Sequence, residues 1–119
     1  MFFKSLREAH KLGAMATKWA GFTRLDPGDR GQITKLAMNY MAEQDMAPED
    51  AWLYSLTQWM NGMPWPEDQL TIARELTRFM DAYEGKIALS AATIVGARMA
   101  AKYITDGALA DAEQPWPGF

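Results

Sequence analysis

Few residues in this chain could carry catalysis, and none stands in a pattern that a known reaction uses. His10 is the single histidine, cysteine is absent, and neither an HExxH nor an ExxH motif occurs. His10 has no cysteine or serine partner at a recognisable spacing for nucleophilic catalysis. We therefore assign no catalytic residue, expect His10 to lie at or near the surface, and expect the protein not to be an enzyme.

Two acidic pairs have the composition of general acid–base dyads, Glu49-Asp50 and Glu67-Asp68. Each pair directly follows a proline, Pro48 or Pro66, and proline suits the first position of a helix. Acidic side chains in a first turn offset the positive end of the helix dipole. Helix initiation therefore explains both pairs without a reaction.

Metal, phosphate and nucleic-acid sites also lack their usual residues. Residues 26–31 hold acids and glycines in the order of neither a calcium loop nor a phosphate loop. The absence of cysteine excludes thiolate metal sites and disulfides and fits a reducing cytosol, so we expect a cytoplasmic protein without metal or cofactor. A DNA-recognition helix presents basic or amide side chains, whereas the helix expected after Pro48 opens with two acids. Nucleic acid is not an expected partner.

Apolar residues recur at helical spacing in five segments, and no run alternates in the manner of a strand. The segments are residues 2–20, a second that is capped by Asp26 or Asp29 and ends near residues 44–45, residues 48–61, residues 66–84, and residues 86–106. Asn61 and Gly62 both tolerate the left-handed conformation and are expected to end the third helix. Short connections favour antiparallel neighbours. The sequence predicts an all-α fold, a compact bundle of about five helices in a single domain over residues 1–119.

The last of these segments is apolar over most of its circumference. Its two adjacent stripes are Ile87, Ala91, Ile94, Ala97, Ala101 and Ile104, and Ala88, Ala92, Val95, Met99 and Tyr103. A helix with so little polar surface is expected to be covered on several sides, by the rest of the chain or by a partner. We predict that this alanine-rich C-terminal helix is largely buried, is closed by Gly107, and is followed by an extended Pro-Trp-Pro tail over residues 108–119.

Small residues also recur at steps of four in that helix, and such a row lets another backbone approach closely. Two interpretations remain open: packing against another helix of the same chain, or a symmetric homodimer in which the row pairs with itself. The possible dimer row is Ala88, Ala92, Gly96 and Ala100.

The tripeptide Pro-Trp-Pro occurs twice, at residues 64–66 and 115–117. Flanking prolines hold the backbone extended and present the indole ring at little conformational cost. Trp65 is expected to lie over the core or, if exposed, to bind a partner. Trp116 and Phe119 either fold back over their own domain or form a peptide that binds a partner protein.

The third helix concentrates aromatic and methionine side chains, which suit irregular apolar surfaces. Such a stripe indicates core packing, and the alternative is a pocket for a small apolar ligand between the helices. The residues of this possible pocket are Trp52, Leu56, Trp59, Met60 and Met80.

The N-terminal segment differs in charge from the rest of the chain. Residues 1–24 carry five basic residues and one acidic residue, whereas the remainder has a net charge of −7. This basic amphipathic helix is expected to dock on its own acidic domain, or alternatively to associate peripherally with an anionic membrane or an acidic partner. Charged residues from Lys4 onward interrupt any secretory signal.

The sequence therefore favours a small non-enzymatic protein–protein interaction module, an adaptor, inhibitor or regulator that binds through exposed aromatic residues or through self-association. The alternatives are a helical bundle that binds a small apolar ligand, and peripheral membrane association through the N-terminal helix.

Overall fold

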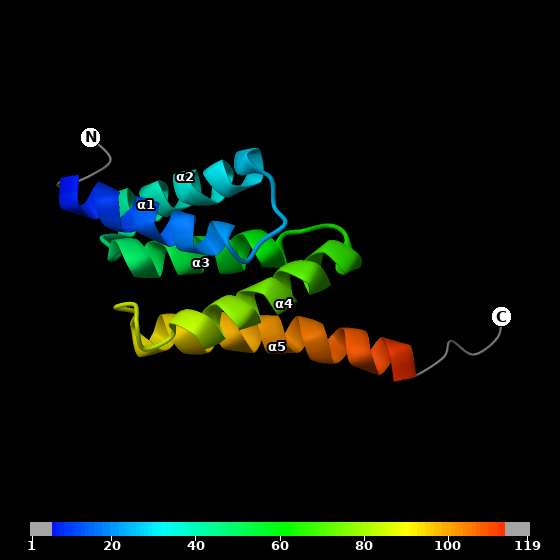
Figure 1. Ribbon diagram of the computed structural model, residues 1–119. Coiled ribbons are helices and arrows are strands. Elements are labelled where there is room, and N and C mark those ends of the chain that lie inside the picture. The colour runs from blue at the N-terminus through cyan, green and yellow to red at the C-terminus, as the bar shows by residue number, and fades with distance from the viewer. Residues whose placement is uncertain (1–5, 114–119) are drawn as a thin grey trace.

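The computed structural model describes residues 6–113, with side chains described as far as residue 108. Over this range the chain forms the helices α1 (Leu6–Ala20), α2 (Pro27–Gln44), α3 (Pro48–Asn61), α4 (Pro66–Tyr83) and α5 (Ala91–Glu113) (Figure 1). The described residues contain no strand, and an isolated bridge joins Glu84 and Ile87. The predicted all-α bundle is confirmed.

The helix starts follow the predicted capping chemistry. Asp26 caps α2, because its Oδ1 accepts a hydrogen bond from the backbone N–H of Asp29 at 2.8 Å. Pro27, Pro48 and Pro66 are the first residues of α2, α3 and α4. The helix α3 ends at Asn61 as predicted. Gly62 ends the helix without adopting the left-handed conformation, since its φ is −85° and its N–H donates to the carbonyl of Gln58 at 3.0 Å.

Three aromatic rings form the centre of the core and join three helices. Trp19 of α1 lies edge-on to Trp52 of α3 and to Phe79 of α4, with ring centroids 6.1 and 5.6 Å apart. Such edge-to-face contacts add to the stabilisation from burial. Around this centre pack further fully buried side chains: Leu12, Met15, Ile33, Ala37, Leu53, Leu56, Met60, Ala73, Leu76 and Met80.

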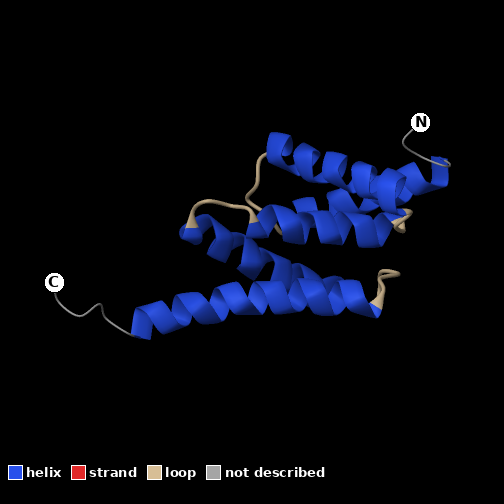
Figure 2. Cartoon of the chain, turned by 180° about the vertical axis from the view of Figure 1, so that it is seen from behind, coloured by secondary structure: helices blue, strands red, loops and turns tan. Residues whose placement is uncertain are grey.

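The helix α3 is central, because it contacts each of the other four helices. The helices α1 and α2 cover one side of it, and α4 and α5 lie on the other side (Figures 1 and 2). The helix α5 packs against α3 and α4, and its C-terminal part extends past the ends of the other helices. It therefore lies at the edge of the bundle.

The prediction that the C-terminal helix is largely buried is wrong. Among its described side chains, Ala97 and Ala101 are buried, whereas Val95, Met99 and Tyr103 are exposed. The reason is geometric: α3 and α4 cover adjacent sides of α5, and the opposite side has no neighbour among the described residues. Helix limits also differ, since α5 begins at Ala91 and continues through Gly107 to Glu113.

The apolar face of α1 joins the core, as the predicted amphipathic pattern allows. Leu12, Met15 and Trp19 are buried, and α1 contacts α2 and α3. Leu6, the first residue of α1, is 90% exposed. From Leu12 to Trp19 the apolar face of α1 is therefore occupied by the chain itself.

Candidate interaction surface

The start of α5 is attached to α3 by a capping arrangement. The backbone N–H of Ser90 donates to Oδ1 of Asp50 at 2.9 Å. The hydroxyl of Ser90 accepts from the N–H of Thr93 at 3.3 Å, as a serine at the N-cap does, and also bonds the Thr93 hydroxyl at 2.8 Å. The helix therefore begins after Ser90, and its first turn is fixed relative to the first turn of α3.

An arginine holds the middle of α5 against the end of α4. Nε of Arg98 lies 3.0 Å from Oε1 of Glu84, and its Nη1 lies 3.0 Å from Oδ1 of Asp81. A third bond, from Nη2 to Oε2 of Glu84, makes the Glu84 contact bidentate. The hydrogen bond to Glu84, followed by that to Asp81 and the charges of both carboxylates, outweighs partial burial and raises the pKa of Arg98 above its ordinary value.

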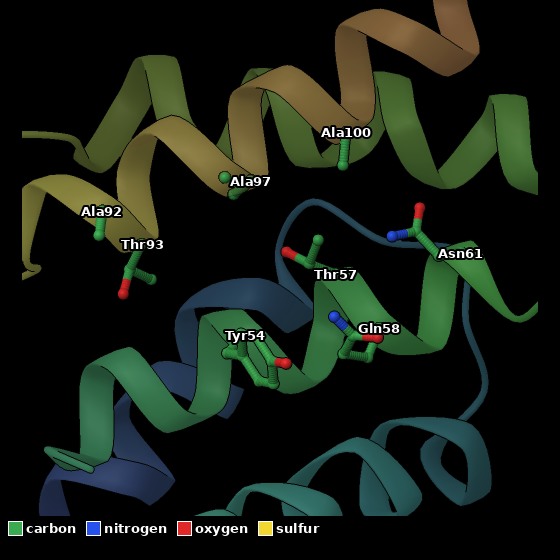
Figure 3. Close-up of a pocket in the computed structure, with 9 residues that line it drawn as sticks. Tyr54, Thr57, Gln58, Asn61, Ala92, Thr93, Ala97 and Ala100 are labelled. Atoms are coloured by element: carbon green, nitrogen blue, oxygen red, sulfur yellow. The ribbon is translucent and has the colours of Figure 1, made fainter.

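After the attachment at Ser90, a groove of about 320 Å³ lies between α3 and α5. Tyr54, Thr57, Gln58 and Asn61 of α3 line one wall, and Ala92, Thr93, Gly96, Ala97 and Ala100 of α5 line the other. Figure 3 shows Thr57 and Asn61 pointing across toward α5, with Thr93 and Ala100 pointing back toward α3. Small side chains on the α5 wall keep the groove open, because they do not reach α3.

Beside the groove, α5 presents large apolar side chains to solvent. Val95 is 54% exposed, Met99 is 65% exposed and Tyr103 is 82% exposed. They recur every four residues and lie on one side of the helix, next to the small residues that line the groove. We call the combined surface the α5 face, and its members are Ala92, Val95, Gly96, Met99, Ala100 and Tyr103.

The three charged side chains of α5 whose placement the structure describes are all in ion pairs. Between residues 91 and 108, α5 carries Arg98, Lys102 and Asp106. Arg98 is paired with α4, and Nζ of Lys102 lies 2.7 Å from Oδ2 of Asp106. Covering this face therefore requires no lone charge of α5 to lose its water, which favours an apolar contact over a charged one.

Three of the four residues of the predicted dimer row lie together in the structure. Ala92, Gly96 and Ala100 line the same wall of the groove, whereas Ala88 lies in the loop before α5 and is not on the row. The inclusion of Ala88 is wrong because Ser90 starts the helix two residues later. A Cβ placed on Gly96 would have no atom within 4 Å, so the chain itself does not close against this row at Gly96.

Of the three aromatic residues predicted to bind a partner, the structure describes one. Trp65, in the link between α3 and α4, is 67% exposed, so the expectation that it covers the core is wrong and its ring is free to contact a partner. Trp116 and Phe119 lie outside the described residues.

The residues of the predicted apolar pocket mostly belong to the core. Trp52, Leu56, Met60 and Met80 are fully buried and belong to one hydrophobic cluster. Trp59 is half-buried and lines a separate surface hollow with Tyr40, Met63 and Pro64. The structure does not bring the five side chains together around a common space.

Sequence reasoning missed a buried carboxylate, Glu75 of α4, which is 1% exposed. Its Oε1 accepts from the hydroxyl of Thr23 at 2.8 Å, and its Oε2 accepts from the N–H of Arg24 at 2.9 Å. The sequence could have indicated this burial, because Glu75 follows Ile72 by three residues and precedes Leu76 by one, a spacing that places it on the buried face of α4. Glu75 holds the link between α1 and α2 onto α4.

Within the described chain, no group of three or more acidic or histidine residues is placed to hold a metal ion. His10 is exposed, as expected. No helix in the same part of the chain is long and apolar enough to cross a membrane. No protein-family model, curated protein or solved structure matches the chain.

Proposed function

We propose that this protein is a helical protein–protein interaction module, and that the α5 face and the adjoining groove are its contact surface. The single observation that carries the proposal is the exposure of Val95, Met99 and Tyr103 on one side of a well-anchored helix. Single exposed apolar residues are common on protein surfaces, whereas a contiguous apolar patch marks a site of association.

Three properties of the face support a protein as the ligand. Its helix is held at the N-terminus by Asp50 and at the middle by Arg98, so binding requires little ordering. Its large side chains alternate with a row of small ones, which suits the ridges and grooves of another helix. Its neighbouring charges are already paired, so an apolar helix face is the best complement.

The other two candidate functions receive less support from the contacts. Four residues of the predicted ligand pocket are packed in the core. Peripheral membrane association would use the apolar face of α1, of which Leu12, Met15 and Trp19 are buried in contact with the rest of the chain, while Leu6 is exposed.

Site-specific photo-crosslinking in cells that produce the protein tests the proposal. A photo-reactive amino acid at position 99 should form adducts with another polypeptide, and the same amino acid at position 6 serves as the control because Leu6 is also exposed but lies on α1. The substitution Val95→Asp should abolish the position-99 adducts, whereas Leu6→Asp should not. Absence of adducts at position 99, or identical adducts at both positions, would overturn the proposal.

A further inference from the structure

We infer that Asn61 is a site of spontaneous deamidation, and that a hydrogen bond from Gln69 to its backbone carbonyl restrains the reaction. Asparagine is chemically labile, and it is most labile before glycine, which has no side chain to hinder the attacking backbone nitrogen. Asn61 precedes Gly62, whereas Asn39, the other asparagine of the chain, precedes Tyr40. The sequence therefore offers one reactive asparagine and one internal reference.

The reaction needs only the chain and water. The backbone nitrogen of Gly62 attacks Cγ of Asn61 and closes a cyclic imide, while the Cγ–Nδ2 bond breaks and ammonia leaves with the proton of the attacking nitrogen. Water then opens the imide. Cleavage of the bond from the nitrogen to Cγ gives aspartate, and cleavage of the bond from the nitrogen to the backbone carbonyl carbon gives isoaspartate. One amide and one water thus become one carboxylic acid and one ammonia.

The position of Asn61 leaves the reacting groups accessible. Asn61 is the last residue of α3, and both it and Gly62 are exposed. The hydrogen bond that Asn61 accepts from Gln69 goes to its backbone carbonyl and not to its side-chain amide, so the amide can turn toward the nitrogen of Gly62. Helix ends open more readily than helix interiors, and Asn39 lies inside α2. Asn61 is therefore the reactive position on structural grounds as well.

Two hydrogen bonds hold the Asn61–Gly62 peptide and must open before the ring can close, because closure requires rotation about ψ of Asn61. The N–H of Gly62 donates to the carbonyl of Gln58 at 3.0 Å. Nε2 of Gln69, on α4, lies 3.2 Å from the carbonyl oxygens of both Met60 and Asn61 and donates to them. The first bond is an ordinary helical one, so Gln69 is the feature of this fold that adds restraint.

Deamidation would change the groove, because Asn61 belongs to its α3 wall. Asn61 points from α3 toward α5 (Figure 3), so the product carboxylate places a negative charge on that wall. The charge also lies at the C-terminus of α3, where the helix dipole disfavours it. The chemistry is independent of the proposed function, and only its effect on a partner rests on that function.

Peptide mass spectrometry of the full chain after incubation at mildly alkaline pH tests the site. Conversion of Asn61 to aspartate and isoaspartate should exceed conversion of Asn39 by at least about tenfold. Gly62→Ala should slow the conversion of Asn61 by about tenfold, because a Cβ hinders ring closure. Position 62 has a φ of −85°, and the atom nearest to an added Cβ is 3.4 Å away, so this variant should keep the fold. Equal conversion of the two asparagines, or an unchanged rate in Gly62→Ala, would overturn the assignment.

A pair of glutamine variants tests the restraint. Gln69→Ala removes the donor to the Asn61 carbonyl and should speed conversion about fivefold, the factor that corresponds to one lost hydrogen bond. Gln32→Ala is the matched control, because Gln32 is exposed on α2, and it should leave the rate unchanged. Conversion of Asn39 in the same samples should also stay constant, which separates local opening from general unfolding. Equal rates in the two variants, or a parallel rise at both asparagines, would overturn the role of Gln69.

Discussion

Asp50 and Ser90 are forty residues apart in sequence and are joined by a hydrogen bond of 2.9 Å from the Ser90 N–H to the Asp50 carboxylate. This bond fixes the beginning of α5 to the beginning of α3. The wall of the groove that follows, with Ala92 and Thr93 opposite Tyr54, depends on that attachment.

Removal of the Asp50 carboxylate should loosen the start of α5. We expect Asp50→Ala to lower the free energy of unfolding by about 1 kcal/mol, because a hydrogen bond to a charged acceptor is lost at a partly exposed site. Asp50→Asn keeps an oxygen acceptor and should lose less. Hydrogen exchange should become faster at residues 90–93 in the alanine variant, and unchanged exchange there would contradict the attachment.

Arg98 should contribute to stability through its pairing with α4 rather than through its charge alone. Because the Arg98 and Glu84 side chains are each more than a third exposed, we expect Arg98→Met to lower the free energy of unfolding by about 1 kcal/mol or less. Arg98→Lys should recover only part of this loss, because lysine keeps the positive charge but cannot form the bidentate contact. Urea unfolding at low and high salt measures the effect, and a cost that does not shrink with salt would contradict it.

The pH dependence of this pairing follows from the direction of the shift. The pKa of Arg98 is raised in the folded chain, so its contribution is fully present below the ordinary arginine pKa. It is lost as the pH rises through the raised folded-state value. The difference in unfolding free energy between the native chain and Arg98→Met should therefore show no loss from arginine deprotonation between neutral and moderately alkaline pH. A decline there would contradict the pairing.

Glu75 should be among the polar residues most sensitive to substitution. Glu75→Ala leaves the Thr23 hydroxyl and the Arg24 N–H without their acceptor and opens a void, so we expect a loss of about 3 kcal/mol. Glu75→Gln retains the shape and one acceptor oxygen and should lose less. Urea unfolding measures both, and a nearly neutral Glu75→Ala would show that the carboxylate does not hold the link between α1 and α2.

Two glycines should respond to alanine in opposite directions. Gly96 lies inside α5 with open space around it, so Gly96→Ala should stabilise the monomer by about 0.5–1 kcal/mol. Gly85 has a φ of +83°, where a Cβ is strained, so Gly85→Ala should destabilise by about 1 kcal/mol. Thermal unfolding of dilute protein distinguishes them, and equal shifts would contradict the two backbone assignments.

Much of the architecture could be predicted from the residues that start and end helices. Asp26, Pro48 and Pro66 start helices for local reasons, capping and a fixed φ, and local reasons do not depend on the rest of the chain. Ser90 followed by Thr93 is a start signal of the same kind. The apolar spacing alone predicted a helix from residue 86, which is too early and wrongly includes Ala88.

The burial of α5 could not be predicted in the same way. Alanine counts as apolar in a helical pattern, but its small side chain stabilises little when buried, so an alanine-rich circumference does not require a cover on every side. Whether Val95 and Met99 face a neighbour depends on how many helices the bundle can place around α5. That number is set by packing across the whole chain, with α3 at its centre. The small residues of the candidate surface therefore stand out in the sequence, whereas the exposure of its large residues does not follow from their spacing.

Oxidative footprinting of methionine tests most directly whether the α5 face is covered by a partner inside cells. Met99 is exposed, Met63 is half-buried on another surface, and Met60 and Met80 are buried and set the slow limit. The oxidation rate of Met99 relative to Met63 should be high in dilute purified protein and several-fold lower inside cells that produce it, because a bound polypeptide shields the face. An equal ratio under both conditions would show that the face stays open, and would contradict the account.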